Sequence, residues 1–179
     1  MSPLHLAVEN GNQEIVKYLV GLTENPMAPN NTGITPIHRA AFKGQLETLK
    51  YLANLTENPM APSQNGSSLI HCAAAGGHLE TLKFLVSLAE NPMAPSNIGY
   101  TPIHSAAIFG LTLQYENSSK SVESFFEMVK FMIRFTDNPN RSSQNGWTPL
   151  QIARECGYLT AMQCFKFSFL MWRRKFLKF

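Results

Sequence analysis

A four-residue pattern that recurs every 33 residues constrains the fold of this chain more than any other feature. The pattern is Ser or Thr, then Pro or Leu, then Leu or Ile, then His, and its histidines are His5, His38, His71 and His104. A fixed period of this length predicts stacked supersecondary units, because one such unit cannot bury its own apolar face. A fifth copy begins at Thr148, 47 residues after Thr101, which places 14 extra residues inside the fourth unit.

Each unit predicts a helix, a turn, a second helix and a loop. In the second unit Thr35 is expected to cap the first helix, and Pro36 suits the first helical position because its missing N–H is not needed there. His38 falls at the third helical position, where a side chain can reach back to the cap. Gly44 predicts a left-handed turn. Leucines at three- and four-residue spacings over residues 46–55 then predict an amphipathic second helix.

The repeated unit resembles the ankyrin repeat, whose 33-residue signature carries Thr-Pro-Leu-His-x-Ala before two antiparallel helices. The resemblance covers about residues 2–167, through the blocks Gly-x-Thr-Pro-Ile-His-x-Ala-Ala-x-x-Gly and Leu-Glu-Thr-Leu-Lys. It implies an all-α fold: an α-solenoid of about five helix-turn-helix repeats joined by β-turn or hairpin loops. The expected ankyrin repeat domain is 1–167, with repeats at about 1–32, 33–65, 66–98, 99–145 and 146–167.

The ends of the second helices depart from the family pattern. The family usually has Gly there, and a left-handed residue of another type would be slightly strained. The residues at these positions here are Thr23, Thr56, Ala89 and Thr136.

The insert in the fourth repeat, residues 111–124, is polar and contains four serines. The second helix of this repeat is expected to resume near Phe125. One interpretation is a solvated loop that prolongs a flanking helix, because long insertions at exposed turns cost little free energy. The other is a docking or phosphorylation site at Ser118, Ser119 or Ser121, since loops on rigid scaffolds often carry function.

Residues 168–179 form a basic aromatic segment after the expected last helix, 159–167. Residues 166–179 hold five of the 15 basic residues and no acidic one, which leaves 10 basic against 12 acidic residues elsewhere. The body therefore predicts no nucleic-acid binding. The segment itself suits an anionic membrane surface or a partner groove. In the alternative interpretation its aromatic residues cover the end of the stack or lead into sequence beyond it.

Catalytic and metal-binding patterns are not found in the sequence. Adjacent helices pack about 8 to 10 Å apart, so the four repeat histidines are too far apart to share a metal ion and are expected to form a ladder of caps. His78 is interpreted as a turn residue. There is no glycine-rich phosphate loop, nucleophile elbow or paired-carboxylate arrangement. We therefore expect no enzymatic activity, no cofactor, no metal and no small-molecule substrate.

The three cysteines, Cys72, Cys156 and Cys164, share no spacing with one another or with a histidine pair. An odd, unpatterned set indicates reduced thiols in an intracellular protein. The sequence therefore favours a cytoplasmic location, with the nucleus as the alternative.

The ankyrin resemblance implies that a partner protein binds to the loop tips and to the exposed side of the first helices, which line a concave wall. The positions of this surface that vary from repeat to repeat are the candidates. The candidate partner-binding residues are Ile34, Phe42, Lys43, Ile98, Tyr100, Ile108, Phe109, Trp147 and Glu155. The alternative interpretation of Tyr100 and Trp147 is that they pack between neighbouring loops.

The leading hypothesis is a non-catalytic interaction module that binds another protein, centred on repeats four and five. A second hypothesis is a membrane-peripheral tether or adaptor that uses the basic aromatic segment. A third is that the chain is the ankyrin segment of a larger channel, ligase or kinase, which would place the biological activity outside these residues.

Overall fold

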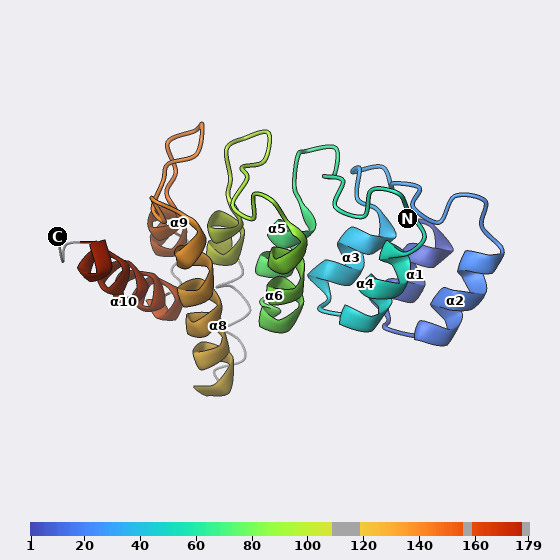
Figure 1. Cartoon of the computed structure of the whole chain (residues 1–179), viewed down its shortest axis with the longest axis horizontal. Helices are drawn as coiled ribbons and strands as arrows, with labels where there is room; N and C mark the ends of the chain where they lie inside the picture. The colour runs from blue at the N-terminus through green and yellow to red at the C-terminus, as the bar shows by residue number, and fades with distance from the viewer. Residues whose placement is uncertain (109–118, 156–158, 177–179) are drawn as a thin grey trace.

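The computed structural model describes residues 1–108, 119–155 and 159–176, and within them the chain forms a row of helix pairs with its loops on one side (Figure 1). No strand occurs among these residues, so the predicted all-α repeat fold is confirmed. A short 3-10 helix, η1 (Ile133–Phe135), extends α8. The pairs are α1 (Pro3–Glu9) with α2 (Gln13–Gly21), α3 (Pro36–Phe42) with α4 (Leu46–Ala53), α5 (Leu69–Ala75) with α6 (Leu79–Leu88), helical residues 102–108 with α8 (Ser119–Met132), and α9 (Pro149–Glu155) with α10 (Leu159–Phe176).

The first helices start at the caps that the sequence predicted, but the way in which the cap is held differs between repeats. The Ser2 and Ser68 hydroxyls accept hydrogen bonds from the backbone N–H groups of His5 and His71, and both form reciprocal capping boxes. Thr35 forms no such bond to the backbone; its Oγ1 lies 2.8 Å from His38 Nδ1 instead. The cap of α3 is therefore held through the histidine side chain.

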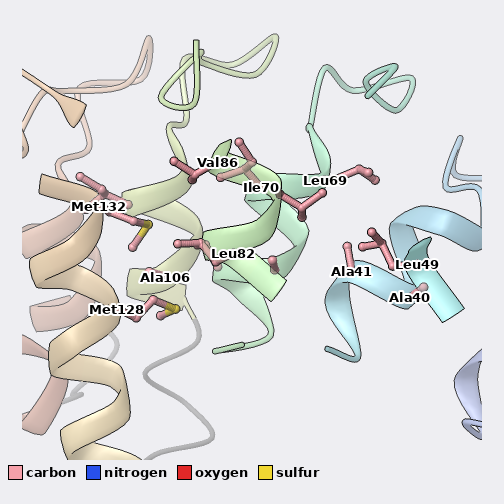
Figure 2. Close-up of a cluster of buried hydrophobic side chains, with 14 of the residues drawn as sticks. Ala40, Ala41, Leu49, Leu69, Ile70, Leu82, Val86, Ala106, Met128 and Met132 are labelled. Atoms are coloured by element: carbon pink, nitrogen blue, oxygen red, sulfur yellow. The ribbon is translucent and has the colours of Figure 1, made fainter. Parts of the chain in front are cut away.

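The core is a continuous apolar layer that runs through the stack (Figure 2). Ala40, Ala41 and Ala106 of the first helices are fully buried, and these small side chains let neighbouring first helices approach closely. The second helices fill the remaining space with larger side chains such as Leu82 and Met128. Each repeat thus buries its apolar face against the next repeat, which is the source of stability in a solenoid.

Two adjacent glycines in the third repeat have different roles. Gly77 has a φ of 74°, the left-handed conformation that glycine adopts without strain. Gly76 is right-handed, but a Cβ atom there would lie only 2.0 Å from the carbonyl oxygen of Phe42. The close approach of two successive repeats therefore requires glycine at 76.

The second helices end without the left-handed residue that the sequence analysis considered. Ala89 has φ −94° and ψ 133°, and Thr136 has φ −143° and ψ 143°. Both are extended conformations that any residue adopts. The expected strain is therefore absent at these two positions, because the chain leaves the helix directly toward the loop.

The fourth and fifth repeats differ most from the expected boundaries. Helix α8 begins at Ser119, so residues 119–124 lengthen the second helix, as one interpretation of the insert proposed. Residues 109–118, which include Ser118, lie outside the described residues. The expected end of the last helix at Phe167 is wrong, because α10 continues to Phe176 with Ser168 fully buried.

Candidate partner-binding surface

Three of the repeat histidines connect one repeat to the loop of the next. The Nε2 atoms of His5 and His71 each lie 2.8 Å from a carbonyl oxygen, those of Ile34 and Tyr100, and His104 Nε2 lies 3.0 Å from the Trp147 carbonyl. A carbonyl only accepts, so each Nε2 donates and each Nδ1 accepts at its own cap. The ring thereby fixes a helix start and a loop backbone together.

This connection is the feature that the sequence analysis missed. The predicted caps account only for the contact of each Nδ1 atom with its own helix start, and not for the hydrogen bond of Nε2. The separation from histidine to loop residue is 29 positions for His5 and for His71, and 43 for His104. The difference is the 14-residue insert. Each acceptor residue directly follows the glycine of a loop tip. The repetition of this glycine in the sequence could have been used to predict which carbonyl each histidine contacts.

Burial lowers the pKa of His38, His71 and His104 and so favours their neutral forms. It lowers the pKa of His38 from 6.5 to about 4, and the Ser67 backbone opposes this only in part. The Ser67 backbone lies near the His38 ring, but Nε2 makes no hydrogen bond of good geometry, whereas the Nε2 atoms of the other three rings do. Burial also lowers the pKa of His71 and His104, against the opposing effect of their carbonyl partners. A neutral ring is the form that can donate through one nitrogen and accept through the other.

The loop tips are connected to one another as well as to the helices. We call residues 63–67, 96–100 and 143–147 the three later tips. Asn97 N donates to the Asn65 carbonyl at 3.1 Å, and Gln144 N donates to the Ile98 carbonyl at 3.1 Å. Within the last tip, Ser143 N donates to the Trp147 carbonyl at 2.8 Å. Backbone hydrogen bonds therefore join the three tips into one row.

Four of the apolar candidates are exposed on this framework. Ile98 is 49% exposed, Ile108 43%, Trp147 42% and Phe42 37%. Ile34 is half-buried, and Phe109 lies outside the described residues. The hydrogen bond from Gln144 to Ile98 places the tip that carries Ile98 beside the tip that carries Trp147.

Tyr100 has a different position from Trp147. Its ring stacks on His104, with the ring centroids 5.0 Å apart and the planes 16° from parallel, and it is half-buried. Tyr100 therefore packs within its own repeat, and its main contact is structural.

The charged candidates are engaged with other charges. Lys43 Nζ lies 2.6 Å from Glu9, and Arg39 Nε lies 2.9 Å from the same carboxylate, so this cluster links the first and second repeats. Glu155 is exposed and pairs with Arg154 at 2.9 Å. Partner contacts through Lys43 would have to compete with Glu9.

The remaining chemistry of the described residues gives no reactive centre. Burial raises the pKa of the Cys72 thiol to about 12 and also raises that of Cys164, so neither forms a thiolate readily. Within residues 1–108, 119–155 and 159–176, no cluster of three His, Cys, Asp or Glu side chains is placed to hold a metal ion. The described helices include none that is long and apolar enough to cross a bilayer.

Comparison with known families identifies the repeats. A family model described as ankyrin repeats (3 copies) matches residues 1–63, and a second, ankyrin repeats (many copies), matches residues 64–115. No curated protein matches the chain. Ankyrin repeats are generally non-catalytic protein–protein interaction modules. The 33-residue period, the paired helices and these matches show that the chain belongs to the ankyrin repeat family.

Proposed function

We propose that this chain is a non-catalytic module that binds another protein through its loop tips and the exposed side of its first helices, centred on repeats four and five. The observation that carries the proposal is the exposure of Ile98, Ile108 and Trp147. Ile98 and Trp147 lie on loop tips whose backbone accepts hydrogen bonds from histidines and forms hydrogen bonds with neighbouring tips. A surface ordered before binding loses little conformational entropy when a partner arrives.

Trp147 is the expected anchor of the interface. Tryptophan is among the residues that contribute most to binding when truncated. Tyr100 supports the same tip through His104 but contributes less of its own surface. Phe42 extends the surface toward the second repeat.

The test is capture of a partner from the native source by the wild-type chain and by Trp147→Ala. We expect the variant to bind the captured partner about tenfold more weakly, or about 1.4 kcal/mol. Thermal unfolding should hardly change, because the Trp147 side chain is 42% exposed and its structural hydrogen bond comes from the backbone.

Tyr18→Ala is the matched control, since Tyr18 is an aromatic residue that is 69% exposed on α2, far along the chain from the proposed interface. It should leave capture unchanged. Equal affinity of wild type and Trp147→Ala for the captured partner would contradict the proposal. Tyr100→Ala is less informative alone, because loss of its stacking on His104 is expected to reduce both stability and binding.

We do not propose the membrane tether as a second function. Phe169 and Trp172 are half-buried and pack against the core, so part of the aromatic segment covers the end of the stack. That these repeats serve a larger channel, ligase or kinase stays a hypothesis, because one fold supports many functions.

A further inference from the structure

A groove of about 580 Å³ lies over the second helices of the last repeats, and none of its lining residues belongs to the loop tips or to the first helices. We call it the outer groove. Its lining includes Glu127, Lys130 and Phe131 of α8. Leu79 and Lys83 of α6 line one part, and residues of α10 line another. It is therefore separate from the surface proposed above.

The arrangement of the residues that line the outer groove suits a helical occupant. Lys130, Phe131 and Arg134 lie three, four and seven positions after Glu127, so a single face of the α8–η1 segment lines the groove. In Figure 1, α8 stands between α6 and α10, and α10 tilts away from it. A depression between helices of this kind is the usual receptor for an amphipathic helix, which lays its apolar face inside.

The apolar part of the groove continues onto the free surface of α10. Met171 lines the groove and is 53% exposed. Phe167 lies four positions before Met171 and Leu170 one position before it, so the three side chains share one face of α10. Phe167 is 63% exposed and Leu170 is 57% exposed. An occupant with an apolar face longer than the groove would thus find further apolar contacts along α10.

The charged part of the groove is mainly positive. Lys83, Lys130 and Arg134 line it against one acidic residue, Glu127. Lys130 pairs with Glu127 at 3.0 Å and Lys83 pairs with Glu80 at 2.8 Å. Among the described residues Arg134 has no ion pair within 4.0 Å. Carboxylates on a partner would complement this charge.

We propose that the outer groove is a second binding site, for an amphipathic helix of another protein whose apolar face is flanked by acidic residues. The chain would then hold two partners on separate surfaces. A flat anionic membrane fits less well, because a concave site lined from three helices contacts a flat surface less than it contacts a convex helix. The proposal is independent of the partner-binding surface at the tips.

The chain offers its own reporter for the test. Its two tryptophans are Trp147 and Trp172, and Trp172 lines the groove. In the full chain with Trp147→Phe, the emission of Trp172 reports occupancy. The probe is a synthetic, tryptophan-free helical peptide with leucines along one face and glutamates beside them. A second peptide has lysine in place of every glutamate.

We expect saturable binding of the glutamate peptide and at least tenfold weaker binding of the lysine peptide, because the groove is positive. The groove variants Lys130→Glu and Arg134→Glu should each weaken the glutamate peptide about tenfold. Lys17→Glu is the matched control. Lys17 pairs with Glu14 at three-residue spacing in α2, as Lys130 pairs with Glu127 in α8, so both changes break the same kind of pair. Only Lys130 lines the groove.

Three results would overturn the proposal: no saturable binding of the glutamate peptide, equal binding of both peptides, or equal effects of Lys17→Glu and Lys130→Glu. Anionic vesicles form a separate arm. If they change Trp172 emission with the same dependence on Lys130 and Arg134 while the peptide has no effect, the groove faces a membrane surface instead. Capture at the tips should remain normal when Lys130→Glu and Arg134→Glu are made in the chain that keeps Trp147, which separates failure of this site from failure of the first.

Discussion

The first three repeats and the last two are joined by different kinds of contact. Between the early repeats the contacts are small or polar: buried alanines, the approach of the Phe42 carbonyl to Gly76, and the bridge from His5 to the Ile34 carbonyl. Between the last two repeats the buried alanines and the histidine bridge recur, at Ala106, Ala153 and His104, and large aromatic contacts are added to them. Phe165 packs edge-on against Phe125, with ring centroids 5.7 Å apart, and lies 5.6 Å from the Phe169 ring.

The helices differ in the same way. The second helices of the first three repeats have 8 to 10 residues, whereas α8 has 14 and α10 has 18. The regular part of the chain makes a uniform frame, and the irregular part makes surfaces that the period does not provide. Trp147 and most of the residues that line the outer groove lie in the irregular part, while Leu79 and Lys83 of α6 belong to the regular part. We therefore expect the residues that choose the binding partner to lie where the sequence departs from the regular repeat.

The largest expected effect comes from the aromatic contact. Phe165→Ala should reduce the free energy of unfolding by about 4 kcal/mol, because it removes a fully buried ring and leaves a cavity. Urea unfolding measures the loss. Both tryptophans lie in the last two repeats, so fluorescence reports this part and circular dichroism reports all the helices. We expect fluorescence to change at lower urea than circular dichroism.

Phe167→Ala is the control for that change, two residues further along α10. Its ring is 63% exposed, so the expected loss is below about 0.5 kcal/mol. Similar losses for the two variants would mean that the aromatic cluster does not hold the last repeats together.

A substitution at Gly76 tests how closely the regular repeats pack on one another. Gly76→Ala should reduce the free energy of unfolding by about 3 kcal/mol, because a methyl group would meet the Phe42 carbonyl oxygen at 2.0 Å and the two repeats would have to separate. Gly21→Ala is the control, since a Cβ atom there has nothing within 4 Å. A similar small effect of both changes in urea unfolding would show that the early repeats are not closely packed.

The histidines give the regular part a pH dependence. Burial lowers the pKa of His38 from 6.5 to about 4, so the unfolded chain binds the proton more readily. The stability that His38 contributes by staying neutral is present above pH 6.5 and is lost as the pH falls toward 4. The loss from His38 between pH 7 and pH 5 is about 2 kcal/mol. His38→Gln should remove about that much of the difference between unfolding free energies at the two pH values.

The fifth repeat provides the control for pH, because Gln151 takes the place of histidine there. Its side-chain oxygen accepts from Thr148 N at 2.9 Å, so glutamine can hold the same cap without titrating. Gln151→His should leave the pH dependence nearly unchanged, because position 151 is exposed. An unchanged pH dependence in His38→Gln would show that His38 is not the titrating group.

The smallest effect concerns the charged link between the first two repeats. Glu9→Gln removes the partner of Arg39 and Lys43, and we expect a loss of about 1 kcal/mol that decreases with added salt. Glu14→Gln breaks an exposed pair with Lys17 inside one helix and should cost less than about 0.5 kcal/mol. Thermal unfolding at low and high salt compares them; a Glu9 loss that does not respond to salt would contradict the electrostatic explanation.

Much of the fold followed from the period, because caps and turns are set by neighbours in sequence. Ser68 with His71, and Gly44 in its left-handed turn, occupy the predicted positions. The boundaries of α8 and α10 did not follow, since they depend on packing against other helices. Nothing local distinguishes Ser168 as a buried residue, for example, until the core around Phe165 is in place.

The sequence could predict which residues are candidates for the partner-binding surface, but not which of them are exposed and which are engaged in contacts within the protein. Variation between repeats selected Trp147 and Tyr100 together, and only the packing separated them into an exposed side chain and one stacked on His104. Lys43 was selected as a partner contact without any indication of Glu9, which is distant in sequence. Exposure and pairing depend on contacts between repeats.

The sequence by itself determined the repeating helix pair, its caps and its turns, because these depend on hydrogen bonds within a few residues of chain. Only the tertiary structure decided that the histidines bridge to the next loop, that Phe42 and Gly76 meet, and that α6, α8 and α10 enclose a positive groove. Those features arise where one repeat packs on another, and a close contact between residues about 30 or more positions apart has no local signature in the chain.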